Sequence, residues 1–212
     1  MPEKNIFAPR TISYFYDTVS SMTGRTHDLA AFTLLNAAFV YMHAPQMTLA
    51  TAICAFGANM IGGLLPDIDD ASADIWDKVR AGSLLARIIK PIVGSHRMFS
   101  HSIIGMAIIG FLLKHLLTAM GTVLLVDMSI IWWSVMIGYL SHLLSDSLTS
   151  EGVPWLLPLR MRFGFPPVRW FRIKTGSWGE SLLFVPLLIA ANGYLFYTYY
   201  QTYYVFFRTL IK

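Results

Sequence analysis

Cysteine and charged residues are both scarce in this sequence, and each shortage excludes a class of protein. The single cysteine, Cys54, can form no disulfide within the chain and cannot build a thiolate metal cluster. Only 13% of the 212 residues are charged, whereas 55% are hydrophobic, and the mean hydropathy is +0.55. This apolar excess indicates a protein that crosses a membrane several times, since a soluble domain of this length needs far fewer apolar residues.

Targeting segments and repeats are also lacking. The first 27 residues contain Lys4, Arg10 and Arg25 but no continuous apolar core, so we expect no secretory signal peptide. The chain has no repeat of fixed period and no low-complexity tract. We therefore predict one membrane-embedded domain over residues 25–212, preceded by a cytoplasmic or interfacial segment over residues 1–24.

Five hydrophobic segments are present, each near the roughly 20 residues that a helix needs to cross the hydrocarbon layer. They predict an all-α, polytopic membrane bundle of about five transmembrane helices, at residues 28–44, 47–65, 101–119, 128–147 and 182–206. Two long loops separate some of them. Residues 72–93 interleave apolar and charged side chains, which is typical of a helix lying in the membrane interface. Residues 155–172 mix aromatics, arginines and prolines, which predicts an irregular interfacial loop.

The distribution of positive charge predicts an orientation. Thirteen of the 16 lysines and arginines precede the first segment or lie in the two long loops. The positive-inside rule then places the N-terminus and both loops in the cytoplasm, and five crossings leave the C-terminus in the periplasm. The net charge of +4 fits basic loops that face anionic lipid, so we expect membrane lipid as a partner and no nucleic acid.

Histidines and carboxylates gather in four short clusters at one predicted end of these helices. Such groups are costly near lipid unless they pair, bind a metal or face water. Helical hairpins bring the end of one helix beside the start of the next, so the four clusters can meet. They lie at residues 25–27, 66–70, 96–101 and 142–146.

Each cluster alone has an ordinary explanation. His142 and Asp146 are four residues apart on one helix face, where they can hold one ion or where Asp146 can simply orient His142. The aspartates after Pro66 stand at a helix C-terminus, whose dipole disfavours carboxylates, so a metal ion or Arg97 should compensate them. His96 and its neighbours can equally be interfacial groups bonded to backbone.

Taken together, the clusters predict a metal site for Zn²⁺, Mn²⁺ or Fe²⁺, with one or two ions. In this interpretation a metal-bound water is the nucleophile, Arg97 stabilises the developing negative charge and Asp70 is the general base. The predicted ligands are His27, Asp67, Asp69, His96, His101, His142 and Asp146.

A fifth stretch precedes the last hydrophobic segment. Lys174 and Ser177, with neighbouring glycines, can form an anion-binding turn, and Glu180 can be a further ligand or a catalytic base. Alternatively, Ser177 is the N-cap of the last helix and Glu180, three residues on, completes a capping box.

In this order, these elements resemble the bacterial inner-membrane family of the YdjM type, which also carries the label LexA-binding, inner membrane-associated hydrolase. The resemblance covers about residues 25–185. Ser100 stands where members often have threonine, which keeps the hydroxyl, and residues 1–24 have no counterpart. The matching elements are His27, Gly63-Leu64-Leu65-Pro66-Asp67-Ile68-Asp69, His96-Arg97-Met98-Phe99-Ser100-His101-Ser102, the stretch 138–149 followed by Gly152-Val153, and Thr175-Gly176-Ser177 with Glu180.

The resemblance implies a metal-dependent hydrolase in the bacterial inner membrane. The predicted position of the clusters, at the cytoplasmic interface beside the headgroups, favours a lipid or phosphoester as its substrate. Two other functions stay open. A metal-ion or proton-coupled transporter would need polar groups across the bilayer, for which Asn36, Asn59 and Lys114 offer only a thin trail. A non-enzymatic scaffold would use the metal structurally.

Overall fold

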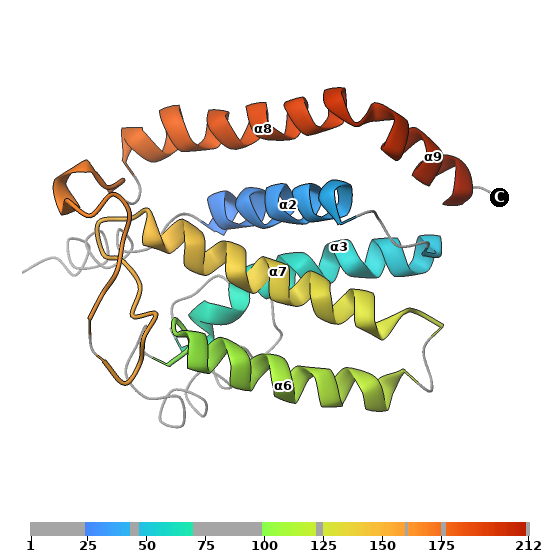
Figure 1. Ribbon diagram of the computed structural model, residues 1–212, viewed down its shortest axis with the longest axis horizontal. Helices are drawn as coiled ribbons and strands as arrows, with labels where there is room; N and C mark the ends of the chain where they lie inside the picture. The colour runs from blue at the N-terminus through green and yellow to red at the C-terminus, as the bar shows by residue number, and fades with distance from the viewer. Residues whose placement is uncertain are drawn as a thin grey trace, which may run out of the picture.

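The protein is an all-helical bundle, as predicted (Figure 1). The computed structural model describes residues 24–42, 47–69, 99–121, 125–159, 161–174 and 177–210. Two predicted segments lie outside these ranges. They are residues 1–23 of the N-terminal segment 1–24, and the interfacial helix expected at 72–93. The described helices are α2 (Gly24–Tyr41), α3 (Leu49–Leu64), α6 (Ile103–Met120), α7 (Met128–Ser147), α8 (Val185–Thr198) and α9 (Tyr200–Leu210), with short helical turns at Leu65–Asp69, Arg169–Phe171 and Glu180–Phe184.

Helix α7 is the centre of the bundle and packs against α2, α3 and α6. Its contact with α3 is close because glycines face the partner backbone. A Cβ on Gly138 would lie 2.1 Å from the Asn59 carbonyl oxygen, and one on Gly62 would lie 2.1 Å from the Val135 carbonyl oxygen. Only glycine permits this approach, which brings the C-terminal end of α3 against the C-terminal half of α7.

Polar N-caps begin three of the helices. Thr48 accepts from the Thr51 amide, Ser102 from the Gly105 amide, and Asp127 from the amides of the second and third residues after it. Each cap satisfies a backbone donor that the first turn leaves without an intrahelical partner. These caps fix where α3, α6 and α7 start.

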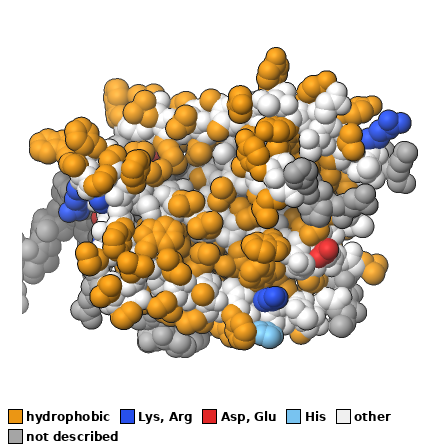
Figure 2. Space-filling view, viewed as in Figure 1, with side chains coloured by type: hydrophobic (Ala, Val, Ile, Leu, Met, Phe, Trp, Pro, Cys, Tyr) orange, Lys and Arg blue, Asp and Glu red, His pale blue; other side chains and the backbone are white. Residues whose placement is uncertain are grey.

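Four described helical stretches are long and apolar enough to cross a membrane: Leu49–Asp67, Ile103–Met120, Met128–Ser147 and Glu180–Thr198. Helix α2, the first of the five predicted segments, is not among them. It packs against α3, α7 and α8 and buries Ala30, Ala31 and Asn36. The space-filling view shows a face dominated by hydrophobic side chains (Figure 2), as expected for a surface in contact with lipid.

The last hydrophobic segment differs from the single helix predicted for residues 182–206. It breaks at Tyr199, whose backbone is non-helical (φ −112°, ψ 27°), so that α8 ends at Thr198 and α9 begins at Tyr200. The Tyr203 hydroxyl donates to the Asn36 Oδ1 atom, and the Tyr203 ring stacks on Phe39 with centroids 5.5 Å apart. These contacts with α2 draw α9 across the end of the bundle, which hydrophobicity alone could not indicate (Figure 1).

The loop after α7 is irregular, as predicted for residues 155–172. Two isolated β-bridges, Thr149 with Ile173 and Val153 with Phe163, fold it back on itself. Three aromatic side chains on it point outward: Phe165 is 68% exposed, Trp170 90% and Phe171 77%. Exposed aromatics of this kind are typical of the level of lipid headgroups.

Candidate metal centre

Four chain segments converge at one end of the bundle and bring five predicted ligands together. The start of α2 supplies His27, the turn after α3 supplies Asp67, and the residues before α6 supply His101. The last turns of α7 supply His142 and Asp146. In Figure 1 this is the left end, where α2 and α6 begin and where α3 and α7 finish.

The imidazoles and carboxylates face one another through single atoms. His101 Nε2 lies 3.6 Å from Asp67 Oδ1 and 3.5 Å from Asp146 Oδ2. His142 Nε2 lies 3.6 Å from each of the same two oxygens. Two histidine nitrogens and two carboxylate oxygens thus surround one small space.

His27 extends the cluster on the other side of Asp146. Its Nε2 atom lies 3.5 Å from Asp146 Oδ1, the oxygen that faces away from His101 and His142. Its ring stacks on the ring of His142, with centroids 3.9 Å apart and planes 9° apart. The ligand atoms form two overlapping groups of three, His27 with His142 and Asp146, and Asp67 with His101 and His142, each with its atoms within 4.8 Å of one another.

These residues fit a transition metal. Separations of 3.5–3.6 Å are too long for hydrogen bonds. They are close to the spacing of about 3.3 Å between two ligand atoms that share a tetrahedral ion with bonds of about 2.0–2.1 Å. Within the described residues, Asp67 Oδ1, His101 Nε2 and His142 Nε2 are buried and have no hydrogen-bond partner. Buried polar atoms without a hydrogen-bond partner are costly. An ion or a water in the space between these three atoms would remove that cost.

Second contacts fix the histidine rings. His142 Nδ1 lies 2.7 Å from the Gly63 carbonyl oxygen, which can only accept, so Nδ1 carries a proton and Nε2 faces the cluster as the atom available to a metal. His101 Nδ1 lies 3.1 Å from Ser100 Oγ, and the Tyr139 hydroxyl donates to the Ser100 carbonyl. Such outer bonds orient a ligand and select its tautomer.

Glu180 is buried, at 2% exposure, and its carboxylate contacts the start of α2. Thr26 Oγ1, next to His27 in the chain, donates to Glu180 Oε1 at 2.6 Å. The helical turn that begins at Glu180 has Gly179 as its N-cap and no side-chain cap. The Ser177 carbonyl accepts from the Glu180 amide at 3.1 Å. The contact of the Glu180 carboxylate with Thr26 was foreseen by neither of the two roles considered for Glu180.

Two of the remaining predicted site residues, Lys174 and Ser177, are described, and they do not join the cluster. Lys174 is exposed and Ser177 is half-buried, and within the described residues no side-chain bond links either of them to the ligands. Asp69 ends the turn after α3, and its side chain is outside the described set, as are Asp70, His96 and Arg97. Their assigned roles remain predictions.

Sequence reasoning missed the supporting groups. Thr26 and Tyr139 were not predicted as site residues. Thr26 lies one position before His27, and Tyr139 lies three positions before His142. The Gly63 carbonyl could not be found at all, because a backbone acceptor carries no signal in the residue type.

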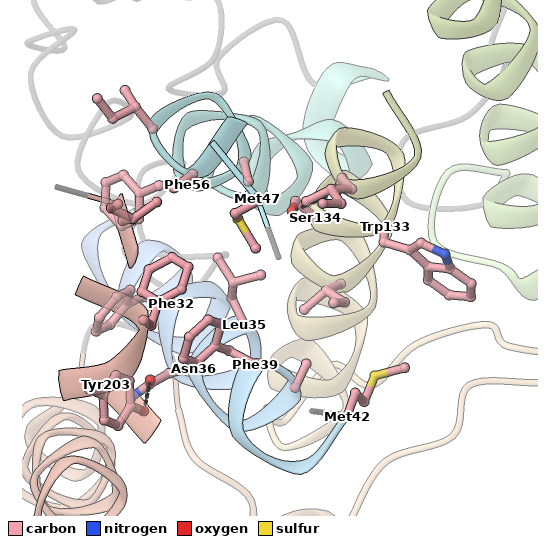
Figure 3. A pocket seen from close by; sticks show the side chains of 18 of the residues that line it. Phe32, Leu35, Asn36, Phe39, Met42, Met47, Phe56, Trp133, Ser134 and Tyr203 are labelled. Carbon is pink, nitrogen blue, oxygen red and sulfur yellow. Dashed lines mark hydrogen bonds between the residues drawn. The ribbon is translucent and has the colours of Figure 1, made fainter. Parts of the chain in front are cut away.

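The polar groups considered for a transport route are engaged elsewhere. Asn59 donates to the Ser134 carbonyl, Lys114 lies over the Trp132 ring at 5.8 Å from its centroid, and Asn36 bonds to Asn192. A cavity of about 720 Å³ lies in the half of the bundle away from the cluster, with a lining that is almost wholly apolar. Figure 3 shows Phe32, Leu35 and Phe56 around it, with Tyr203 bonded to Asn36 at its edge.

Comparison with known proteins places the chain among bacterial membrane proteins. A family model described as YdjM inner membrane protein matches residues 22–205. The uncharacterized protein YvsG of Bacillus subtilis (strain 168) is 30% identical over 175 residues, which is 82% of this chain and 95% of that protein. The inner membrane protein YdjM of Escherichia coli (strain K12) is 38% identical over 106 residues, about half of either chain, at 49% and 48%. No solved structure matches.

Proposed function

The chain belongs to the YdjM family of inner membrane proteins, and we propose that it is a metal-dependent hydrolase embedded in that membrane. Its substrate is a lipid, cleaved at a phosphoester or ester bond. The observation that carries the proposal is the convergence of three histidines and two aspartates, from four separate segments, on one buried space. Random polar side chains in a bundle this apolar would not be expected to meet in this way.

In this proposal the ligands form a principal set and an extension. Asp67, His101, His142 and Asp146 hold one divalent ion, Zn²⁺, Mn²⁺ or Fe²⁺. His27, through the other oxygen of Asp146, provides for a second. When bound, the metal supplies a water of lowered pKa and polarises the scissile bond. Gly63 and Ser100 hold the two imidazoles in the orientation that directs Nε2 at the ion.

Other side chains handle charge and protons. Glu180 is buried and accepts a hydrogen bond from Thr26, the residue before His27, and in this proposal it accepts a proton from the attacking water. Asp70 is the alternative base, and Arg97 would stabilise negative charge on the substrate. Lys174 and Ser177 are assigned to the approach of the anionic substrate rather than to the reaction itself.

The site faces the cytoplasm in this proposal. Support comes from the 13 of 16 basic residues on the same side of the predicted crossings as the cluster. Location at the end of membrane helices also places the ligands beside headgroups, where a lipid phosphoester or ester bond is accessible. A soluble substrate would have no need of a site at this depth.

A second function is favoured by one observation. His101 and His142 are each 1% exposed, and closed metal sites of this kind are typically structural. In that case the protein is a membrane scaffold that a metal ion stabilises. A transporter has less support, because the side-chain amides of Asn36 and Asn59 already donate to Asn192 and to the Ser134 carbonyl.

The test is hydrolysis by purified protein in lipid nanodiscs loaded with Zn²⁺ or Mn²⁺. Phosphoester and ester lipids are offered, and released headgroup or fatty acid is measured. We expect turnover that chelator abolishes and that His142→Ala removes, whereas His115→Ala, at an exposed position on α6, has no effect. Metal bound in wild type without turnover on any substrate would favour the scaffold.

A further inference from the structure

A second polar site lies beyond the metal cluster, in the loop that follows α7. Ser150, four positions after Asp146, begins it. An open pocket of about 320 Å³ is lined there by Ser150, Glu151, Arg162, Arg169 and Arg172. None of these residues has a part in the hydrolase proposed above.

Backbone carbonyls hold two of the three arginines in place. Arg169 Nε donates to the Ser150 carbonyl at 2.8 Å. Arg172 donates twice, from Nε to the Pro166 carbonyl at 2.7 Å and from Nη2 to the Pro167 carbonyl at 3.0 Å. A guanidinium has five N–H donors, so each side chain is oriented by one or two bonds and keeps other donors for a ligand. The arginines are thus pre-organised before any ligand arrives.

Two glycines lie against the Arg172 guanidinium. A Cβ on Gly164 would lie 2.5 Å from Arg172 Nη1, so a side chain there would displace the end of the arginine. Gly152 has a φ of +67°, and a Cβ there would lie 2.6 Å from the Phe163 carbonyl oxygen and 3.3 Å from Arg172 Nη1. A side chain at Gly152 would therefore strain the backbone, and the loop packs closely against Arg172.

The pocket carries a net positive charge. Glu151 is its one acidic group among the described residues, and its Oε2 atom lies 3.4 Å from Arg162 Nη1. Three arginines against one glutamate leave an excess of two positive charges. Arginine forks match the oxygens of a phosphate group, so the ligand chemistry that fits is a phosphate oxyanion.

Neighbouring side chains indicate where that phosphate comes from. Phe165, Trp170 and Phe171 flank the arginines in the chain and are 68%, 90% and 77% exposed. Exposed aromatics are costly in water and favourable at the level of lipid headgroups. An arginine pocket at the level of the headgroups is surrounded by lipid phosphates. Their local concentration is higher than that of phosphate in solution.

We infer that this arginine pocket binds the phosphate of an anionic membrane lipid. Binding does not depend on the metal site or on hydrolysis, and the inference stands apart from the proposed function. The bound lipid phosphate would hold this end of the bundle against the headgroups. The pocket would also favour anionic over zwitterionic lipid around the metal cluster.

The experiment is native mass spectrometry of the full chain from detergent, after equilibration with phosphatidylglycerol or phosphatidylcholine. Wild type should retain phosphatidylglycerol about tenfold better than phosphatidylcholine, the effect expected of one charge-assisted bond. Arg169→Gln should remove most of that preference. Arg208→Gln, an equally exposed arginine on α9, is the matched control and should keep it.

A second variant separates binding from folding. Glu151→Gln removes the negative charge of the pocket and should strengthen phosphatidylglycerol retention, which a damaged loop could not do. Equal retention of the two lipids by wild type, or an unchanged preference in Arg169→Gln, would overturn the inference. Displacement of the lipid by millimolar inorganic phosphate would also overturn it, in favour of a soluble phosphate ligand.

Discussion

Helix α2 takes part in two buried polar groups, one near each end, and they are built in opposite ways. Near its start, His27 belongs to the metal cluster, where imidazole and carboxylate atoms face one another at 3.5–3.6 Å. Towards its end, Asn36 belongs to a network with α8 and α9. Both groups are buried in the same apolar bundle. The difference in their bonding therefore indicates whether each one stabilises packing or binds a ligand.

The network near Asn36 closes on itself. Asn36 Nδ2 donates to Asn192 Oδ1 at 2.9 Å, and Asn192 Nδ2 donates to Thr33 Oγ1 at 2.6 Å. The Tyr203 hydroxyl donates to the side-chain oxygen of Asn36, Oδ1. Each amide is used by its neighbours, which is how polar groups inside a helical bundle stabilise packing.

The cluster does not close in this way. Its histidines use Nδ1 for outer bonds to Gly63 and Ser100 and direct Nε2 at carboxylates that are too far for a hydrogen bond. A group that only stabilised packing would shorten these distances, as the asparagine network does. The cluster instead has the spacing of ligands around an ion.

The largest effect is expected where α3 and α7 touch. Gly138→Ala places a Cβ 2.1 Å from the Asn59 carbonyl oxygen, so the helices must separate and the end of α3 moves from α7. We expect a loss of about 3 kcal/mol or more in the free energy of unfolding, at or above the upper range for overpacking, and loss of bound metal. Thermal unfolding and metal analysis on the same preparation measure both.

The control for that variant is Gly57→Ala, on α3 with nothing within 4 Å of the added Cβ. It should match wild type in melting temperature and in metal content. Comparable damage from both substitutions would mean that glycine content, and not the close contact, stabilises the pair.

Chelation should distinguish the cluster from the network. If the cluster holds a metal, removing it costs about 2.7 kcal/mol when the free metal stood at a hundred times its Kd, and the melting temperature falls. The same chelator should leave the melting temperature of His142→Ala unchanged, because that variant has no ion to lose. A fall of equal size in both proteins would contradict the assignment.

Substitution in the asparagine network should destabilise the fold without affecting the metal. Asn36→Leu leaves the Tyr203 hydroxyl and Asn192 without this partner, at a cost of about 1–3 kcal/mol. Metal content should stay at the wild-type value. Loss of metal from this variant would show that the two polar groups are coupled along α2.

Features that depend on local spacing in the sequence were predicted, whereas features that depend on contacts between distant residues were not. Hydrophobic length predicted the helices, and the spacing of His142 and Asp146 placed both ligands on one face correctly. The break at Tyr199 was missed because it depends on Tyr203 reaching Asn36, a contact between residues 167 positions apart. Glu180 was expected either as a cap or as a site residue, and its bond with Thr26, 154 positions away in the chain, was missed for the same reason.

A smaller effect is expected from the groups that orient the ligands. Ser100→Ala removes the hydroxyl 3.1 Å from His101 Nδ1, and loss of such outer contacts typically lowers metal affinity 10–100-fold. The fold should be unchanged, since the substitution removes one side-chain bond. Competition with a metal-sensitive dye measures the affinity, and an unchanged value would exclude Ser100 from the site.

The central claim is that the cluster holds a metal ion, and metal analysis of the protein purified in detergent without chelator tests it most directly. Wild type should contain one or two equivalents of a transition metal. His142→Ala and Asp67→Ala should lose it while remaining folded, and His115→Ala should retain it. Wild-type protein that is metal-free as purified, and still metal-free after Zn²⁺ or Mn²⁺ is added, would contradict the account.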